Sequence, residues 1–153
     1  MNQKLTKSNF RRYLECPNEF WLGVHHPELV ESEISPDIAF RIRQGYEVER
    51  CFKELILARN SCVYQFQKKV ESERLFAKFD VFADDGHIYE VKSSKYKDPG
   101  DSKYRNIREV NLYDVGFQVY AARESGLEVS KAFLVLLNGD YILGDELDLD
   151  QLF

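Results

Sequence analysis

Long apolar runs, paired cysteines and a basic net charge are all missing from this chain, and each absence narrows its class. No run of about 18 apolar residues occurs, so the sequence predicts no membrane-spanning helix. The opening MNQKLTKSNFRR has no apolar core of the kind that a secretion signal carries. The three cysteines, Cys16, Cys51 and Cys62, have unrelated spacings, which indicates reduced thiols rather than a disulfide framework. We therefore expect a cytoplasmic protein without membrane association.

The net charge of −5 gives no general attraction to nucleic acid, but the charge is unevenly distributed. The segment from Ser93 to Arg108 is basic, and its cations include Lys95, Lys97, Lys103 and Arg105. A basic segment on an acidic protein can still hold a phosphate backbone, although a solvated loop without a partner has the same composition.

The 153 residues, 44% of them apolar and 14% aromatic, suit one domain with a substantial core. We expect a single domain over 1–153, with a helical and loop extension over 1–34 and a core over 35–144.

Helical signals come first along the chain. Thr6 can cap a short helix that ends at about residue 15, before a Cys-Pro pair. Residues 23–34 read as a loop. Ser35 followed by proline is typical of a helix start, and this second helix is expected to run to about Arg59.

Strand signals follow, interrupted by one more helix. Alternating or continuous apolar patterns predict strands over 62–70, 74–83, 87–93, 131–138 and, after an Asn-Gly turn, 141–144. Between them a helix is expected over about 107–125, stopped by Gly126. This order predicts an α/β fold with one mixed central sheet flanked by helices.

The most unusual stretch is FDVFADDGHIYEVKSS, residues 79–94, which reads as two strands around a turn. Glu90 and Lys92 share one face because strand side chains alternate. With a three-residue loop ending at Gly86, counting back puts Asp80 opposite Glu90. A two-residue turn would pair Asp80 with Val91 instead, so a joint role for the two acids requires the longer loop, with Gly86 in the left-handed conformation.

Two carboxylates directly opposite each other repel unless a cation lies between them. Hard oxygen ligands suit Mg²⁺ or Mn²⁺, which complete their shells with water and substrate phosphate. Lys92 could then contact a phosphate oxygen or an attacking water. The residue types therefore predict hydrolysis of a phosphodiester.

The second predicted helix carries one misplaced acid. Its apolar stripe consists of Ile38, Ile42, Gly45, Phe52 and Ile56. Glu49 occupies the step between the glycine and the phenylalanine. Because a buried unpaired carboxylate is costly, Glu49 needs a partner, and a nearby arginine would serve as well as a metal.

The spacing of Asp80 and Glu90-Val91-Lys92 resembles the D…ExK signature of the PD-(D/E)xK nuclease superfamily. The RecB-like exonuclease branch also carries Gly-x-x-x-His on the preceding helix, with the histidine as a metal ligand. Here Gly45 is present and Glu49 stands at the histidine position. The branch has a glutamine on the later helix, matched by Gln118, although Ala122 replaces the tyrosine that usually follows it.

The N-terminal LTKSNFRRYLECPNEFWL is similar to the start of the RecB-like proteins related to the CRISPR-associated iron–sulfur exonucleases. In those proteins the corresponding cysteine binds a cluster whose other three ligands follow the nuclease core. No cysteine follows Cys62 here, so we expect no iron–sulfur cluster, and Cys16 should pack as a small apolar residue.

The resemblance implies a restriction-endonuclease-like core and a Mg- or Mn-dependent deoxyribonuclease, with exonuclease action suggested by the branch. Asp80, Glu90, Glu49 and the carbonyl of Val91 would hold the metal. Lys92 would act on the water or the phosphorus, and Gln118 would hold DNA or water. The expected DNA contacts are Lys95, Lys97, Lys103, Arg105 and Tyr120.

The alternative is a catalytically weak module of the same fold that binds nucleic acid or docks a partner. A further nuclease, helicase or CRISPR-type partner is left open by the sequence.

Overall fold

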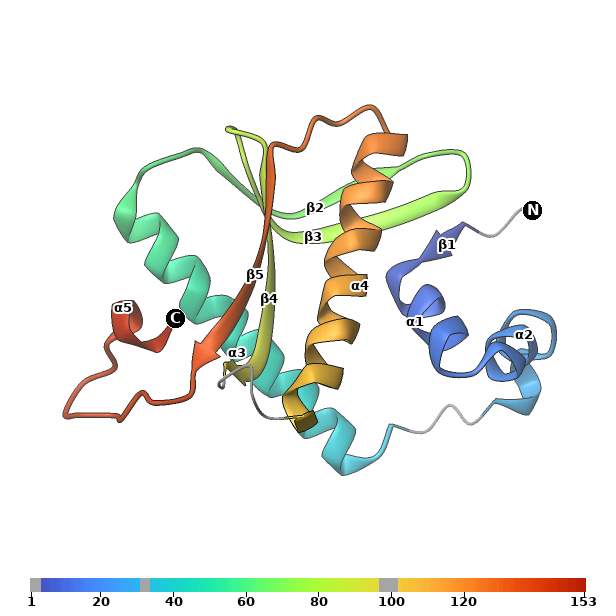
Figure 1. The fold of residues 1–153 in the computed structure, drawn as a ribbon, viewed down its shortest axis with the longest axis horizontal. Helices are drawn as coiled ribbons and strands as arrows, with labels where there is room; N and C mark the ends of the chain where they lie inside the picture. The colour runs from blue at the N-terminus through green and yellow to red at the C-terminus, as the bar shows by residue number, and fades with distance from the viewer. Residues whose placement is uncertain (1–3, 31–33, 97–101) are drawn as a thin grey trace.

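The computed structural model describes residues 4–30, 34–96 and 102–153, with 102–108 described by their backbone alone. It is an α/β fold around one five-stranded sheet (Figure 1). In chain order the elements are β1 (Leu5–Thr6), α1 (Lys7–Glu15), α2 (Pro17–His25), the 3₁₀ turn η1 (Pro27–Leu29), α3 (Pro36–Arg59), β2 (Tyr64–Glu71), β3 (Leu75–Ala83), β4 (His87–Tyr96), α4 (Ser102–Glu124), β5 (Lys131–Asn138) and α5 (Leu149–Leu152).

The sheet is mixed, as the sequence predicts, and β3 is its most connected strand. One edge of β3 pairs antiparallel with β2. The other edge is shared, because β1 runs parallel to Leu75 and Phe76 whereas β4 runs antiparallel to Val81 and Phe82. Farther on, β4 pairs in parallel with β5. The edge of β3 therefore has a gap between β1 and β4, and the chain that leaves β1 enters α1 beside that gap.

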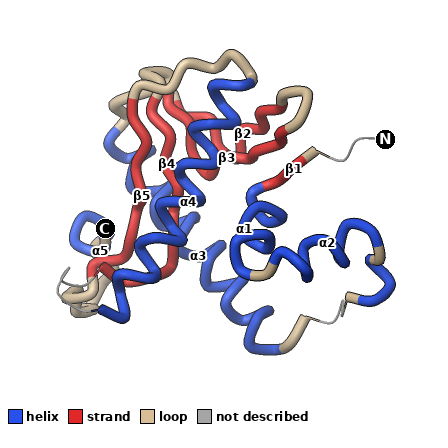
Figure 2. The backbone as a smooth tube through the Cα atoms, turned by 45° about the vertical axis from the view of Figure 1, so that its right-hand side comes forward, coloured by secondary structure: helices blue, strands red, loops and turns tan. Residues whose placement is uncertain are grey.

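The two long helices cover opposite faces of the sheet, and α4 and α3 each have an apolar cluster of their own. Phe117, Ala121 and Ala122 of α4 pack on a cluster around Phe79 and Ile88. On the other face, α3 packs on a cluster that includes Phe52, Ile56, Val81 and Val91. Figure 2 shows α4 lying along the sheet, with α1 beside it. Phe10 of α1 stacks on Phe117 with ring centroids 5.5 Å apart, which fixes the N-terminal segment to this layer.

Two of the three predicted helix starts are confirmed, whereas α4 begins at Ser102 and not at about residue 107. The Thr6 hydroxyl accepts the N–H of Asn9 at 3.2 Å, and the Ser35 hydroxyl accepts the N–H of Ile38 at 3.3 Å. These hydroxyls satisfy backbone donors that the first turn leaves free. The interpretation of 23–34 as loop is wrong in its first residues, since Pro17 also starts a helix that reaches His25.

The apolar stripe predicted along the second helix is only half correct. Phe52 and Ile56 are buried, but Ile38 and Ile42 are 50% and 43% exposed. The first half of α3 extends past the end of the sheet and has no layer to pack on (Figure 1).

The strand predicted at 141–144 is also wrong. The Tyr141 hydroxyl accepts the N–H of Asp148 at 3.0 Å, and the Asn138 amide donates to the carbonyl of Gln151 at 2.9 Å. These bonds turn the segment back toward α5 instead of pairing it with β5. No helix among the described residues is long and apolar enough to cross a membrane.

Candidate functional site

The turn between β3 and β4 adopts the longer of the two predicted forms. Val81 pairs with Tyr89 and Phe82 with Ile88, and Gly86 has a φ of 81°. The N–H of Gly86 donates to the carbonyl of Ala83 at 3.0 Å. The regular pairing ends at Val81 and Tyr89; continued by one step, it would set Asp80 opposite Glu90. The longer loop that a joint role for the two acids requires is therefore present.

The strands separate at this point. The Asp80 carboxylate, and not a backbone carbonyl, accepts the N–H of Val91 at 2.8 Å. On the other edge of β3, Gln67 interrupts β2 with a φ of 53°, a conformation that few residues other than glycine adopt. Asp80 therefore lies where both ladders of β3 are irregular, which frees its side chain from a regular sheet face.

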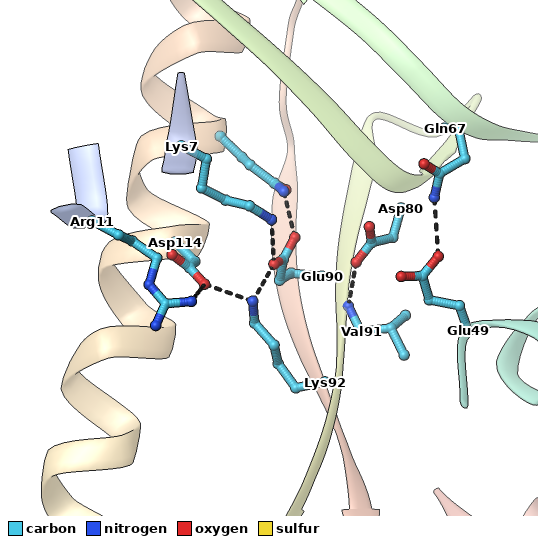
Figure 3. A network of polar contacts seen from close by, with 10 residues as sticks. Lys7, Arg11, Glu49, Gln67, Asp80, Glu90, Val91, Lys92 and Asp114 are labelled. Atoms are coloured by element: carbon cyan, nitrogen blue, oxygen red, sulfur yellow. Dashed lines mark hydrogen bonds and ion pairs between the residues drawn. The ribbon is translucent and has the colours of Figure 1, made fainter. Parts of the chain in front are cut away.

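Glu90 is the most enclosed acid of the site, with 1% of its surface exposed. Its Oε1 accepts the Nζ of Lys7 and the Nζ of Lys92, each at 2.6 Å. Its Oε2 accepts a hydrogen bond from the amide of Gln118 (Figure 3). Burial acts to raise the pKa of Glu90, but the two ammonium groups outweigh it and the pKa is lowered. Glu90 is therefore ionised at neutral pH with its charge fully compensated.

Asp80 has the opposite electrostatic environment. Burial raises its pKa from 3.8 to about 7, and the negative charge of Glu90 adds to the rise. The hydrogen bond from Val91 lowers the pKa but does not offset burial. No ion pair joins Asp80 to a lysine or arginine among the described residues, so its charge has no counterion among them.

Lys92 is held by a second acid that the D…ExK pattern does not contain. Its Nζ lies 2.6 Å from Oδ2 of Asp114, which is fully buried on α4, and Arg11 approaches the same oxygen at 3.8 Å. Burial acts to lower the pKa of Lys92, but Glu90 and Asp114 outweigh it and raise the pKa. Lys92 therefore stays cationic at neutral pH.

The predicted polar line of α4 is confirmed as an inward face. Asn111, Asp114 and Gln118 are all buried, whereas Arg123 and Glu124 on the opposite side are exposed. The sequence indicated this inward face because the line carries little charge, whereas the opposite side of the helix is charged. It placed Asp114 on the line but did not predict its bond to Lys92.

Glu49 approaches from α3, and its partner is an amide rather than an arginine. Its Oε2 accepts the Nε2 of Gln67 at 3.1 Å. Burial raises the pKa of Glu49; Lys78 opposes this rise and Glu90 adds to it. Glu49, Asp80, Lys7 and Gln118 line one cavity of about 530 Å³.

Lys7 is the site residue that the sequence reasoning missed. It belongs to the short Ser- and Arg-bearing helix noted at the N-terminus, 83 positions before Glu90, and only the pairing of β1 with β3 brings it to the acids.

The predicted DNA-contact residues do not gather in one place as the acids do. Lys95 is exposed near the end of β4. Tyr120 is 51% exposed and lies two residues from the buried Gln118, so it projects from another face of α4. Lys97 falls outside the described residues, as do the side chains of Lys103 and Arg105.

The oxygen-bearing side chains of the site are the possible ligands of a divalent ion. Among the described residues no group of three or more His, Cys, Asp and Glu side chains is arranged to hold a metal. In Figure 3, Glu90 contacts two lysines, whereas the Asp80 carboxylate points to the Val91 N–H and Glu49 points to Gln67. Among the described residues, the buried Oε1 of Gln118 accepts no hydrogen bond and Asp80 forms no ion pair. The oxygens of Asp80 and Gln118 therefore suit a hard cation, whereas Glu90 is already neutralised by its two lysines.

Comparisons of the chain with protein-family models, with curated proteins and with solved structures returned no match. The interpretation of the site therefore depends on its own geometry and charge.

Proposed function

We propose that this protein is a metal-dependent nuclease of the PD-(D/E)xK type, with a restriction-endonuclease-like core, that hydrolyses phosphodiester bonds of DNA. The observation that carries the proposal is the β3–β4 register, which, continued one step beyond the last regular pair, would set Asp80 opposite Glu90. Lys92 is bonded to the same Glu90 carboxylate. An exonuclease is favoured by the resemblance to the RecB-like branch.

Asp80, Glu90 and Glu49, with the carbonyl of Val91, would hold Mg²⁺ or Mn²⁺. The bound ion would supply a water of lowered pKa and positive charge for the phosphate. Lys7 and Lys92, which neutralise Glu90 when no metal is bound, would lie close enough to the ion site to pair with the phosphate.

Lys92 is best suited to act as a fixed cation. A general base would need a pKa near the working pH, whereas the acids around Lys92 raise its pKa. Its ammonium group would stabilise the charge that builds on the phosphate oxygens. Asp114 is then a positioning residue, because it holds Lys92 in place without touching substrate.

Cleavage of end-labelled single- and double-stranded DNA with Mn²⁺ tests the proposal. Asp80→Asn should lose about 100-fold or more of the cleavage rate, as expected when a metal ligand is replaced. Lys92→Ala should lose a comparable amount, and Lys131→Ala, which removes an exposed cation at the start of β5, serves as the matched control. Cleavage that survives both site substitutions would contradict the assignment.

A nucleic-acid-binding or partner-docking module is the second candidate, and the lysine pair on Glu90 favours it, because that carboxylate already has its counterions. Retention of DNA by the wild type without turnover at any Mn²⁺ concentration would support this module over the enzyme.

A further inference from the structure

A second cavity lies beside the carboxylates and differs from them in charge. Its volume is about 550 Å³, and it is lined by Val110 and by the polar side chains of Arg11, Arg41, Lys92, Ser93, Ser94 and Asn111. Three of these are cations, two carry hydroxyls, and no acid lines it among the described residues. An anion is the ligand that such a lining favours.

Two buried donors in this cavity have no hydrogen-bond partner among the described residues. Asn111 is 7% exposed and its Nδ2 is unpaired, and the Nε of Arg11 is buried and unpaired as well. Buried donors without acceptors cost free energy, and native proteins rarely leave them so unless a ligand or water supplies the acceptor. These two atoms point independently to an acceptor-rich ligand.

The cations of the cavity are only partly neutralised. Arg11 lies 3.8 Å from Asp114 and 3.5 Å from Glu15, distances that leave its donors without short bonds. Lys92 is shared by Glu90 and Asp114. Arg41 is exposed on α3 and forms no ion pair with the described acids. The cavity therefore has three cations in its lining and no acid among the described residues that line it.

We propose that this cavity is a phosphate-binding subsite for a nucleic-acid strand, distinct from the carboxylate site. Lys92 touches both, so a phosphate in the cavity would lie next to the one under attack. The proposal deepens the proposed function by naming where a second phosphate of the substrate binds. The ligand chemistry is a phosphate, either an internal phosphodiester or the terminal phosphate of a strand.

Binding without metal separates this subsite from catalysis. Fluorescence anisotropy in EDTA would use a single-stranded 12-mer bearing either a 5′-phosphate or a 5′-hydroxyl. Arg41→Gln should weaken binding by roughly fivefold or more and reduce the dependence of affinity on salt by about one phosphate contact. Arg43→Gln removes the same charge from an exposed position on the same helix and should bind as the wild type does.

The two probes distinguish the source of the phosphate. If the wild type prefers the 5′-phosphorylated strand and Arg41→Gln loses that preference, the subsite holds a terminal phosphate. If both strands lose affinity equally, it holds an internal one. Equal affinities for wild type, Arg41→Gln and Arg43→Gln, or no binding by the wild type, would overturn the subsite.

Asn111→Leu provides a second variant with a readout that a merely structural residue would not give. Removing an unpaired donor should leave the melting temperature unchanged or raised while oligonucleotide affinity falls. A lowered melting temperature with unchanged affinity would argue against the subsite. If oligonucleotide binding depends on Arg41 but the protein shows no Mn²⁺-dependent cleavage, the subsite is supported and the nuclease is rejected. If the protein cleaves DNA and Arg41→Gln changes neither binding nor cleavage, the nuclease is supported and the subsite is rejected.

Discussion

Asp80 and Glu90 are neighbours across one strand pair, yet the protein treats their charges in opposite ways. Glu90 has two ammonium groups at 2.6 Å and a lowered pKa. Asp80 has one backbone N–H at 2.8 Å and a pKa raised to about 7. The difference follows from the elements around them, because α1 and β4 bring Lys7 and Lys92 to Glu90 and α4 brings the Gln118 amide, whereas α3 brings another acid, Glu49. Cations among the described residues compensate the charge of Glu90 but form no ion pair with Asp80.

Breaking the compensated half should have the largest effect on stability. Lys92→Met leaves Glu90 and Asp114 buried with fewer counterions, and removing one partner of a buried pair costs about 3–5 kcal/mol. Denaturation in urea should show a loss of this size in the free energy of unfolding. Lys95→Met, the matched change at an exposed position of β4, should cost less than about 0.5 kcal/mol. Similar losses in the two variants would mean that Lys92 carries no buried charge pair.

The uncompensated half should respond to pH in the opposite direction from an ordinary acid. The folded state holds the Asp80 proton more tightly than the unfolded state, so stability falls as pH rises from about 4 to about 7. Asp80→Asn keeps an oxygen for the Val91 N–H but removes the charge. It should stabilise the metal-free protein by roughly 1–3 kcal/mol at pH 8 and by almost nothing at pH 4.

Thermal unfolding at several pH values in EDTA measures this difference. Asp140→Asn, at an exposed turn, is the control and should leave the pH profile unchanged. An Asp80→Asn protein that is less stable than the wild type at pH 8 would show that the carboxylate has a counterion after all.

A divalent ion should remove the asymmetry between the two acids. Mn²⁺ or Mg²⁺ at tenfold its dissociation constant stabilises a folded protein that binds it by about 1.4 kcal/mol. This gain should be largest above pH 7, where no proton competes for Asp80, and it should shrink in Asp80→Asn. A melting temperature that responds to the ion equally in both proteins would place the ion elsewhere.

The sequence predicted the site better where its residues are local. Asp80, Glu90, Lys92 and the Gly86 turn lie within one hairpin, so alternation and loop length were enough to bring them together. Gln118 and Asp114 were recognised as an inward line because helical periodicity is also local. Lys7 could not be found in this way, since its position depends on β1 joining the free edge of β3, a contact between distant parts of the chain.

The fold, like the site, was predictable from the sequence where it depends on local patterns. Helices with a capping residue and strands with clear alternation were found close to their observed bounds. The exposed half of α3 and the absence of a strand at 141–144 depend on where the sheet ends and on side-chain bonds to α5. The apolar periodicity of a segment predicts neither its exposure beyond the sheet nor its bonds to a distant helix.

The smallest expected effect on stability is at Gln67 in β2, beside the uncompensated acids Asp80 and Glu49. Gln67 has a φ of 53° opposite Asp80 and donates to Glu49 at 3.1 Å. Glycine adopts this conformation without strain, so Gln67→Gly should stabilise the protein by about 0.5–1 kcal/mol if the strain outweighs the single exposed hydrogen bond. Gln65→Gly, at an exposed position of the same strand with ordinary backbone angles, should instead destabilise by about 1 kcal/mol. Urea denaturation of the pair decides the matter, because two destabilised variants would mean that the amide bond to Glu49, and not relief of strain, governs this position.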